Sequence, residues 1–280
     1  MEIHRFESRY LRFHTVCLVS PAKQAVLIDP GVLPEDADRL RQFCEDHRLN
    51  LTAVVFTHTH GDHFACWPPF ETVPTYGSAR ILDKPAARRE NDVKYVYSIW
   101  RKFRVEAPWA ARFPRIDYPL ADNTELQLPV GNALFVETPG HSTDHSAVVF
   151  PMEQVLFSGD MLIQIPQPFI LDGFRNYFQS LQTLEALVKR FSIQRVIPAH
   201  GPELKSPHMI RRQIEREKQY IRDVVQLLGE LHRKSLSADA IQAHLLKAFA
   251  VNNTILHSHR VNVNTLLREW ESAGPFSLEI

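Results

Sequence analysis

The sequence has little cysteine and no net charge. These two features argue against a disulfide-stabilised protein and against binding driven by overall charge. It contains three cysteines in 280 residues, at positions 17, 44 and 66. An odd and scattered set of this kind provides no disulfide framework and suits a reducing compartment. Lys and Arg together number 32, and so do Asp and Glu. The chain therefore has no overall charge that would attract it to nucleic acid or to a membrane surface.

Long apolar runs are also missing from the sequence. No stretch approaches the roughly 18 apolar residues that a membrane-spanning helix needs. The first residues, Met1–Arg5, lack the basic-then-apolar pattern of a signal peptide. We therefore expect a cytoplasmic protein with no membrane partner. A chain of 280 residues is long enough to bury a full core.

What the chain does contain is a dense group of metal-ligating side chains. Residues 58–63 read His-Thr-His-Gly-Asp-His, and the run 51–57 before them is apolar and rich in β-branched residues. That run predicts a buried strand ending at the motif, with Gly61 at a sharp bend. Imidazoles with a carboxylate between them are ligands for a first-row divalent metal. The candidate ligands here are His58, His60, Asp62 and His63.

Three isolated candidates occur later in matching contexts. His141, Asp160 and His200 each follow a short apolar stretch and a turn residue. Active-site residues gather at the carboxyl ends of strands in α/β sheets, because the loops converge there on a rigid support. One histidine after a strand is weak evidence by itself. The recurrence of the same arrangement predicts that these side chains join the 58–63 motif in one site.

At these residues the chain resembles the metallo-β-lactamase superfamily, over roughly residues 10–205. The resemblance is carried by residues 58–63, Gly140-His141, Ser158-Gly159-Asp160, Pro198-Ala199-His200-Gly201 and Leu27-Ile28-Asp29-Pro30-Gly31. It implies two metal ions that share a bridging carboxylate. The first would be bound by His58, His60 and His141, the second by Asp62, His63 and His200, and the bridge would be Asp160. Every ligand position of the family is filled.

Such a site has a defined chemistry. Two divalent ions about 3.5–4 Å apart hold a bridging water that becomes hydroxide near pH 7, and three imidazoles leave an open coordination position. Asp62 is the predicted catalytic residue, because it can orient the hydroxide proton as well as bind metal. Asp29 and His145 are expected to support the ligands by hydrogen bonds. We expect zinc, with manganese or iron as alternatives, because mixed nitrogen and oxygen sites accept several metals.

The order of elements predicts an α/β chain, of the α+β kind. Strands are expected near 13–19, 24–29, 51–57, 133–138, 146–150, 154–158 and 193–198, and helices near 34–47, 62–69 and 177–191. Several strands follow one another without a helix between them. This pattern fits the fold that the resemblance implies, a four-layer αββα sandwich of two mixed β-sheets. Residues 1–205 would form the catalytic domain.

An insert at 84–115 departs from this minimal core. It holds nine basic residues against three acidic ones, with aromatic residues between them. A helical lid of this composition would suit an anionic small molecule and, less favourably, single-stranded nucleic acid. The alternative is a helical hairpin whose aromatics pack on the core or on a second subunit. The candidate substrate contacts are Tyr97, Trp100, Arg101 and Arg104.

The tail, 206–280, is the second addition. Ser206-Pro207 predicts a capped helix start, and three helices are expected to follow. They resemble the C-terminal, winged-helix-like addition of a branch that includes glyoxalase-II-like hydrolases and a ribonuclease-like subgroup. We interpret the tail as a lid, a packing element or a homodimer contact.

Three functions compete at this point. The leading hypothesis is a dinuclear metal hydrolase that attacks an ester, thioester or lactone of an anionic small molecule with a metal-bridging hydroxide. The second is a phosphodiesterase or ribonuclease that uses the same two metals. The third is a non-hydrolytic, iron-bearing oxygenase or a regulatory ligand-binding member of the same fold. The complete ligand set favours hydrolysis, and the histidine at position 60 opposes the redox diiron branch, which has a carboxylate there.

Overall fold

Short apolar strands pair into two mixed sheets. The structure is a computed structural model, and it describes residues 1–165, 167–234, 236–249, 253–274 and 276. One sheet has six strands in the order β1 (Glu2–Glu7), β2 (His14–Val19), β3 (Gln24–Ile28), β4 (Asn50–Val55), β5 (Thr75–Ser78) and β6 (Tyr118–Leu120). The other has five, in the order β11 (Arg195–Ile197), β10 (Val155–Phe157), β9 (Ser146–Phe150), β8 (Gly131–Glu137) and β7 (Thr124–Leu128).

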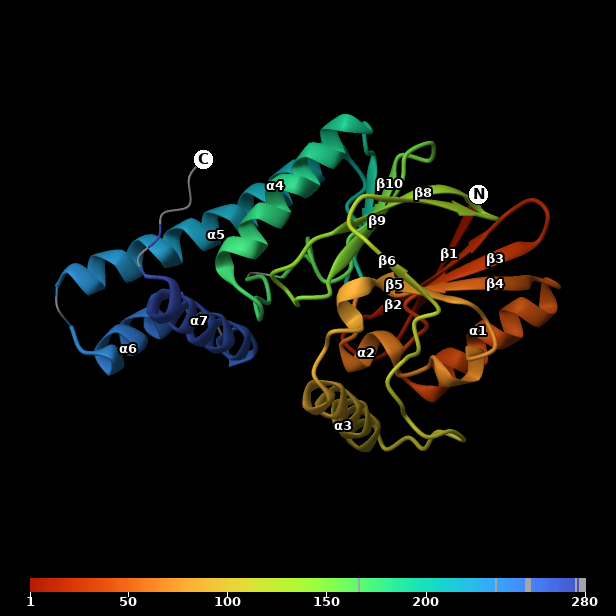
Figure 1. Cartoon of the computed structure of the whole chain (residues 1–280), viewed down its shortest axis with the longest axis horizontal. Helices are drawn as coiled ribbons and strands as arrows, with labels where there is room; N and C mark the ends of the chain where they lie inside the picture. Colours follow the sequence, from red (N-terminus) through yellow and green to blue (C-terminus); the bar gives the residue numbers. More distant parts are fainter. Residues whose placement is uncertain (166, 235, 250–252, 275, 277–280) are drawn as a thin grey trace.

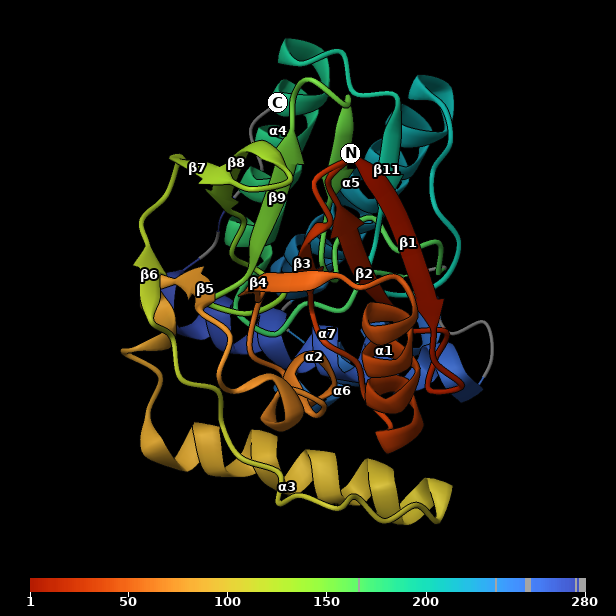
Figure 2. The same cartoon turned by 90° about the vertical axis from the view of Figure 1, so that its right-hand side faces the viewer.

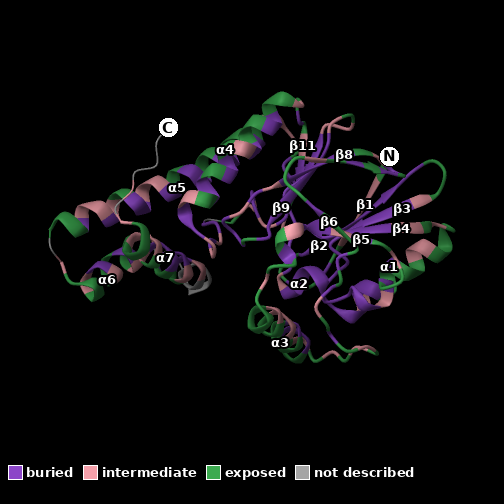
Figure 3. Ribbon diagram, in the orientation of Figure 1, coloured by how far each residue is buried: buried purple, intermediate pink, exposed green. Residues whose placement is uncertain are grey.

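Each sheet combines parallel and antiparallel pairs. Strands β3, β4, β5 and β6 are parallel neighbours, whereas β1 and β2 are antiparallel to their partners. In the second sheet only β10 and β11 run parallel. All residues of β2 and β9 are buried, as expected of strands covered on both faces. Figure 3 shows the inner strands of the two sheets mostly in purple, the colour of buried residues.

Three apolar clusters lie between the layers and hold them together. The middle cluster lies between the sheets, with Val26 and Val55 from one sheet and Phe135 and Phe150 from the other. A second cluster joins the first sheet to α1 (Pro34–Asp46), α2 (Gly61–Phe64) and α3 (Ala86–Phe103). A third joins the second sheet to α4 (Phe174–Arg190) and the tail. The four layers, helix on sheet on sheet on helix, confirm the predicted αββα sandwich (Figures 1 and 2).

The C-terminal helical addition is confirmed. It consists of α5 (Pro207–Arg233), α6 (Ala238–Ala248) and α7 (Asn253–Ala273), and Ser206 caps α5 by accepting the Met209 N–H. The tail contributes Ile221, Val224 and Leu266 to the same apolar cluster as Leu181 of α4. Within the described part of the tail every element is a helix, so the strands of a wing are not found there.

Other details of the sequence prediction need correction. The helix expected near 62–69 is only α2, followed by a 3-10 turn at Pro68–Phe70. The strands β1, β5, β6 and β7 were not expected, and a second 3-10 turn lies at Ala79–Ile81. The insert has one helix, α3, and residues 104–117 after it are not helical, so it is no hairpin. None of the helices in the described residues is long and apolar enough to cross a membrane.

Candidate metal centre

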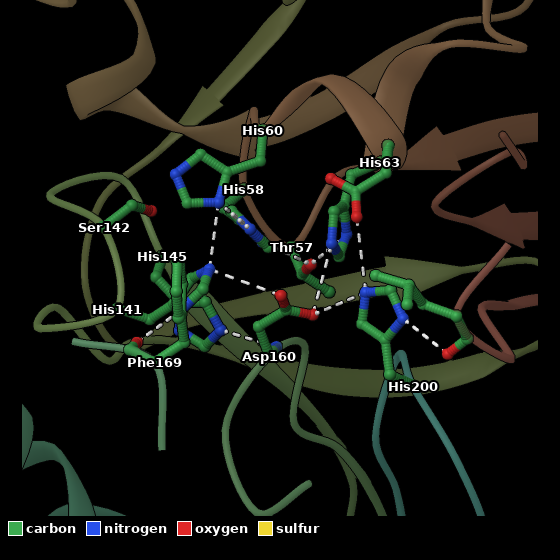
Figure 4. A network of polar contacts seen from close by, with 12 residues as sticks. Thr57, His58, His60, His63, His141, Ser142, His145, Asp160, Phe169 and His200 are labelled. Carbon is green, nitrogen blue, oxygen red and sulfur yellow. Dashed lines mark hydrogen bonds and ion pairs between the residues drawn. The ribbon is translucent and has the colours of Figure 1, made fainter. Parts of the chain in front are cut away.

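The predicted ligands meet at one edge of the two sheets. The 58–63 motif follows β4 and runs into α2, while His141, Asp160 and His200 follow β8, β10 and β11. Three groups of side chains have ligand atoms that all lie within 4.8 Å of one another. They are His58 with His60 and His141, His58 with His63 and Asp160, and Asp62 with His63 and His200. Figure 4 shows the side chains converging.

Gly61 has a different role from the one expected. It begins α2 and does not have a positive φ. A Cβ at this position would lie 2.6 Å from the Asp92 carbonyl oxygen of α3 and 3.0 Å from Val96. Glycine is therefore needed because α3 packs directly against the turn that carries the ligands.

The first group of ligands is centred on one nitrogen of His60. Its Nδ1 lies 3.0 Å from His58 Nε2 and 2.9 Å from His141 Nε2. His141 donates its Nδ1–H to the Phe169 carbonyl at 2.8 Å, so its Nε2 carries no proton and faces the centre. Neighbouring imidazole lone pairs repel one another unless a proton or a cation lies between them, so this arrangement fits a cation.

In the second group, too, hydrogen bonds from Nδ1 orient the histidine rings. His63 donates Nδ1–H to Asp29 at 2.9 Å, and His200 donates Nδ1–H to the Leu11 carbonyl at 3.1 Å. Both Nε2 atoms then face inward, toward the carboxylates of Asp62 and Asp160. His200 Nε2 lies 3.4 Å from Asp62 Oδ2.

Asp160 lies between the two groups. One carboxylate oxygen, Oδ2, is 3.3 Å from His141 Nε2. The other, Oδ1, is 3.2 Å from His63 Nε2 and 3.6 Å from His200 Nε2. A carboxylate whose two oxygens face two different ligand sets has the orientation of a bridge between two ions.

Unpaired buried atoms show that the residues fit metal ions. Within the described residues, His63 Nε2 and Asp160 Oδ1 are buried without a hydrogen bond, although they approach to 3.2 Å. Asp29 already accepts the His63 Nδ1–H. A buried imidazole nitrogen and a buried carboxylate oxygen that both lack partners are costly unless a metal ion satisfies both.

Protonation in the first group also suits metal binding. Burial, followed by repulsion from His141 and Lys84, lowers the pKa of His60 to about 3. Burial and the neighbouring histidines hold the pKa of His58 well below its usual value. These imidazoles are neutral at pH 7, which is the form that binds metal. At His63 burial opposes the charged form, but Asp29 and Asp160 outweigh it and raise the pKa.

The two expected supporting residues lie beside the ligands. Asp29 accepts the Thr57 N–H at 2.9 Å and the Thr57 hydroxyl at 2.7 Å as well as the His63 proton. His145 Nε2 accepts the backbone N–H of Asp160 at 3.0 Å, and its Nδ1 donates to the Thr138 carbonyl at 3.0 Å. Both nitrogens of His145 are engaged, which leaves none for a metal.

The sequence reasoning missed a partly buried ionic cluster behind the motif. Lys84 donates to the Thr59 carbonyl at 2.8 Å and pairs with Asp92 at 2.7 Å. Asp144 accepts the Thr59 N–H at 3.0 Å and also its hydroxyl. Despite burial, Lys84 and Thr59 hold the pKa of Asp144 at about 2. The cluster fixes Thr59 between the ligands His58 and His60, and no spacing in the sequence identified it.

Two tyrosines near the ligands were also missed as a pair. The hydroxyls of Tyr10 and Tyr95 hydrogen-bond to each other, and the Tyr10 ring lies 6.5 Å from that of His200. Burial, followed by the charge of Asp62, raises the pKa of both phenols, that of Tyr95 to about 12. They are protonated donors at neutral pH.

The four candidate substrate contacts lie in different surroundings. Trp100 is 4% exposed in the core beside the first sheet and donates to the Val32 carbonyl at 2.9 Å, so it packs rather than forming an open surface. Tyr97 is 41% exposed, and its hydroxyl accepts the Ala111 N–H at 3.1 Å. Arg101 and Arg104 are exposed, and Arg104 ends α3 in a left-handed conformation.

Comparison with known proteins agrees with this geometry. The family model described as "Metallo-beta-lactamase superfamily" matches residues 9–200. A Caenorhabditis elegans protein, "Beta-lactamase-like protein 2 homolog", is 23% identical over 92% of this chain and 80% of its own length. A "Hydroxyacylglutathione hydrolase" of Halorhodospira halophila is 28% identical over 58% of this chain and 52% of its own length.

Solved structures share the fold. The crystal structure of a metallo-beta-lactamase family protein from Thermus thermophilus superposes with a TM-score of 0.68 and 18% identity. The match covers 98% of this chain and 93% of that one, so the similarity in fold includes the C-terminal helices.

Proposed function

The chain belongs to the metallo-beta-lactamase superfamily, and from that premise we propose that it is a dinuclear metal-dependent hydrolase. Its substrate is an ester, thioester or lactone of an anionic small molecule. The residues that would hold the first ion are His58, His60 and His141, those that would hold the second are Asp62, His63 and His200, and Asp160 would lie between them. The ions are two divalent cations, zinc by preference.

The orientation of Asp160 is the observation that carries the proposal. Its two oxygens face two separate sets of inward-pointing nitrogens, at 3.3 Å on one side and at 3.2 and 3.6 Å on the other. A single ion would need only one of these sets. A second set, with its own outward hydrogen bonds to Asp29 and Leu11, supports two.

The chemistry of the site follows from this arrangement. Bound metal ions would activate a water molecule as the nucleophile and polarise the bond under attack. Asp62 uses one oxygen toward His200, and its other oxygen can accept the proton of the attacking water and so orient it. The phenols of Tyr10 and Tyr95 remain protonated; because one donates to the other, the pair has one proton left to donate to a substrate oxygen. Asp29, Asp144 and His145 keep the ligands in place.

The substrate class is inferred from two further observations. Relatives of this chain include a protein whose name describes hydrolysis of hydroxyacylglutathione and one named as an acyl carrier protein thioesterase. In addition, Arg101 and Arg104 lie exposed on α3, the helix that brings Tyr95 to the site. Exposed cations near a binding site favour an anionic substrate.

Removing the metal tests the proposal. We expect the purified protein to contain about two divalent ions per chain, and a chelator to abolish hydrolysis until metal is restored. Asp62→Ala should reduce turnover to background in a panel of one thioester, one carboxylic ester, one lactone and one phosphodiester. Asp38→Ala, at an exposed position of α1, is the matched control and should keep full activity.

The panel separates the competing functions. Faster turnover of the thioester, ester or lactone supports the proposal. Preference for the phosphodiester would replace it with the phosphodiesterase. Full activity in metal-free protein would rule out the mechanism itself.

A further inference from the structure

His141 is held by a loop on the far side of the site from the 58–63 motif. The loop comprises residues 167–173 and leads into α4. Its Leu171 and Asp172 N–H groups donate to the Gly140 carbonyl at 3.1 and 2.9 Å, and its Phe169 carbonyl accepts the His141 Nδ1–H at 2.8 Å. Both the backbone before His141 and the ring itself are therefore fixed by this loop.

A single side chain of the tail holds the loop on both sides of Phe169. Asn262 of α7 accepts the Ile170 N–H through Oδ1 at 2.8 Å. Its Nδ2 donates to the Pro168 carbonyl, also at 2.8 Å. Asn262 is fully buried, so both bonds are shielded from water, and losing either would leave a buried backbone group unpaired.

A buried network fixes the orientation of the Asn262 amide. Besides bonding to Pro168, Nδ2 donates to the Tyr220 hydroxyl at 2.9 Å. The Tyr220 hydroxyl then donates to His259 Nδ1 at 2.9 Å, and His259 Nε2–H donates to the Leu245 carbonyl at 2.7 Å. Only one arrangement of protons satisfies this chain of bonds, with the Asn262 oxygen directed to Ile170.

The tail contacts the same region elsewhere. The Gln167 side chain donates to the Phe249 carbonyl at 2.6 Å, and Glu269 of α7 accepts the Phe174 N–H at the start of α4 at 2.7 Å. Gln213 of α5 donates to the Ile163 carbonyl at 2.7 Å, three residues after Asp160. The tail thus contacts the chain at both ends of the segment between Asp160 and α4.

We propose that Asn262 is a positioning residue for His141. By fixing Pro168 and Ile170 it keeps the Phe169 carbonyl under the imidazole, which sets the tautomer and the angle of the ring toward the first metal ion. The C-terminal helices are then part of the metal centre rather than a separate attachment. This inference rests on the proposed function, because it takes His141 to be a ligand.

Metal titration of the full chain tests the inference. Metal-stripped wild-type protein, Asn262→Ala and Asn262→Asp would be titrated with Zn²⁺ against a chromophoric chelator. Asn262→Asp keeps the size of the side chain and the acceptor for Ile170 but loses the donor to Pro168 and Tyr220. We expect one of the two ions to bind about tenfold more weakly in Asn262→Ala, with a smaller loss in Asn262→Asp. The second ion should bind as in the wild type.

Ile241→Ala is the matched control. Ile241 of α6 is buried in the same cluster as the other tail helices, and the loss of its side chain destabilises the tail without removing a hydrogen bond to the loop or to the Asn262 network. Unchanged affinity for both ions in this variant, beside a weakened single ion in the Asn262 variants, supports the inference. Equal weakening in the control, or normal affinity in the folded Asn262 variants, would overturn it. If wild-type protein bound no Zn²⁺, the proposed function would fail first and the inference with it.

Discussion

The two halves of the metal centre are supported in different ways. The difference is clearest at one histidine of each candidate ligand group: in the second group, the main support of His63 is Asp29, at the end of the neighbouring parallel strand β3. His141 depends instead on a loop 28 residues later and, through that loop, on Asn262 in the last helix. His63 is thus supported from an adjacent strand, whereas His141, in the first group, is supported by contacts between distant parts of the chain.

This difference separates two kinds of information in a sequence. A motif in which four ligands occupy six residues is readable because the ligands themselves are adjacent. The support of His141 is made largely of backbone carbonyls and N–H groups, which every residue has, so no residue type marks it. Variants at each half should therefore have separable effects on the two ions.

The largest expected effect comes from the glycine before His141. Gly140 has a φ of 126°, and a Cβ there would lie 2.3 Å from the Cα of Tyr177 in α4. Gly140→Ala must move α4 or the loop, and we expect a loss of about 3 kcal/mol or more in the free energy of unfolding.

Gly201, after His200, provides the matched comparison. It also has a positive φ, 75°, but a Cβ there would meet nothing within 4 Å. Gly201→Ala should cost only the backbone strain, about 1 kcal/mol. Denaturant unfolding of both variants measures the difference. Similar losses at the two positions would show that conformation, and not the contact with α4, makes glycine necessary at position 140.

The next effect is expected on the half supported by neighbouring strands. Asp29 has a φ of 50°, a conformation that asparagine tolerates well, so Asp29→Asn keeps the backbone while removing the charge beside His63. We expect one ion to bind about 10–100-fold more weakly in the same Zn²⁺ titration. The ion affected should be the one held by His63, not the one weakened at Asn262.

Asp36→Asn is the control for this variant. Asp36 is buried like Asp29 and accepts the Leu33 N–H at 2.9 Å at the start of α1, but it touches no proposed ligand. Its replacement should lower stability and leave both affinities unchanged. A double variant, Asp29→Asn with Asn262→Ala, should weaken both ions additively if the halves are independent.

Much of the core was predictable because its strands are apolar and end at recognisable residues. The runs before His58, Asp160 and His200 predicted β4, β10 and β11, and the ligands after them are brought together as expected. Strands β5, β6 and β7 were not predicted, since they are short and in β7 only Leu126 and Leu128 are buried. Their pairing depends on neighbours distant in sequence, which local pattern does not reveal.

The site was predictable where particular side chain types identify it, and not where the role of a residue depends on how it packs. Lys84 could be counted only as one charge of a basic insert, whereas in the structure it is partly buried and bonded to Thr59 and Asp92. Trp100 was predicted to contact substrate because of its aromatic ring, but in the structure that ring is buried and packs in the core. Which face of α3 points inward depends on its contact with Gly61. The presence of a glycine at position 61 does not by itself predict that a helix packs against it.

The smallest expected effect concerns the exposed arginines of α3. Arg101 and Arg104 are solvent-exposed, so screening by salt limits their attraction for a substrate. Replacing both with alanine should raise KM for an anionic ester about threefold, leave kcat unchanged, and have no effect on a neutral ester of the same leaving group. The difference should shrink as ionic strength rises.

Lys94→Ala is the control on the same helix, because Lys94 pairs with Glu90 at 2.8 Å on an exposed face. Its removal should leave KM unchanged for both the anionic and the neutral ester. An equal change for the anionic and the neutral ester in the Arg101 and Arg104 variant would mean that these arginines form only a solvated face. Selection of the anionic substrate would then have to come from the protonated phenols of Tyr10 and Tyr95. In that case the substrate contacts would come from Tyr95 of α3 and from Tyr10 in the loop before β2, whose ring lies beside that of His200.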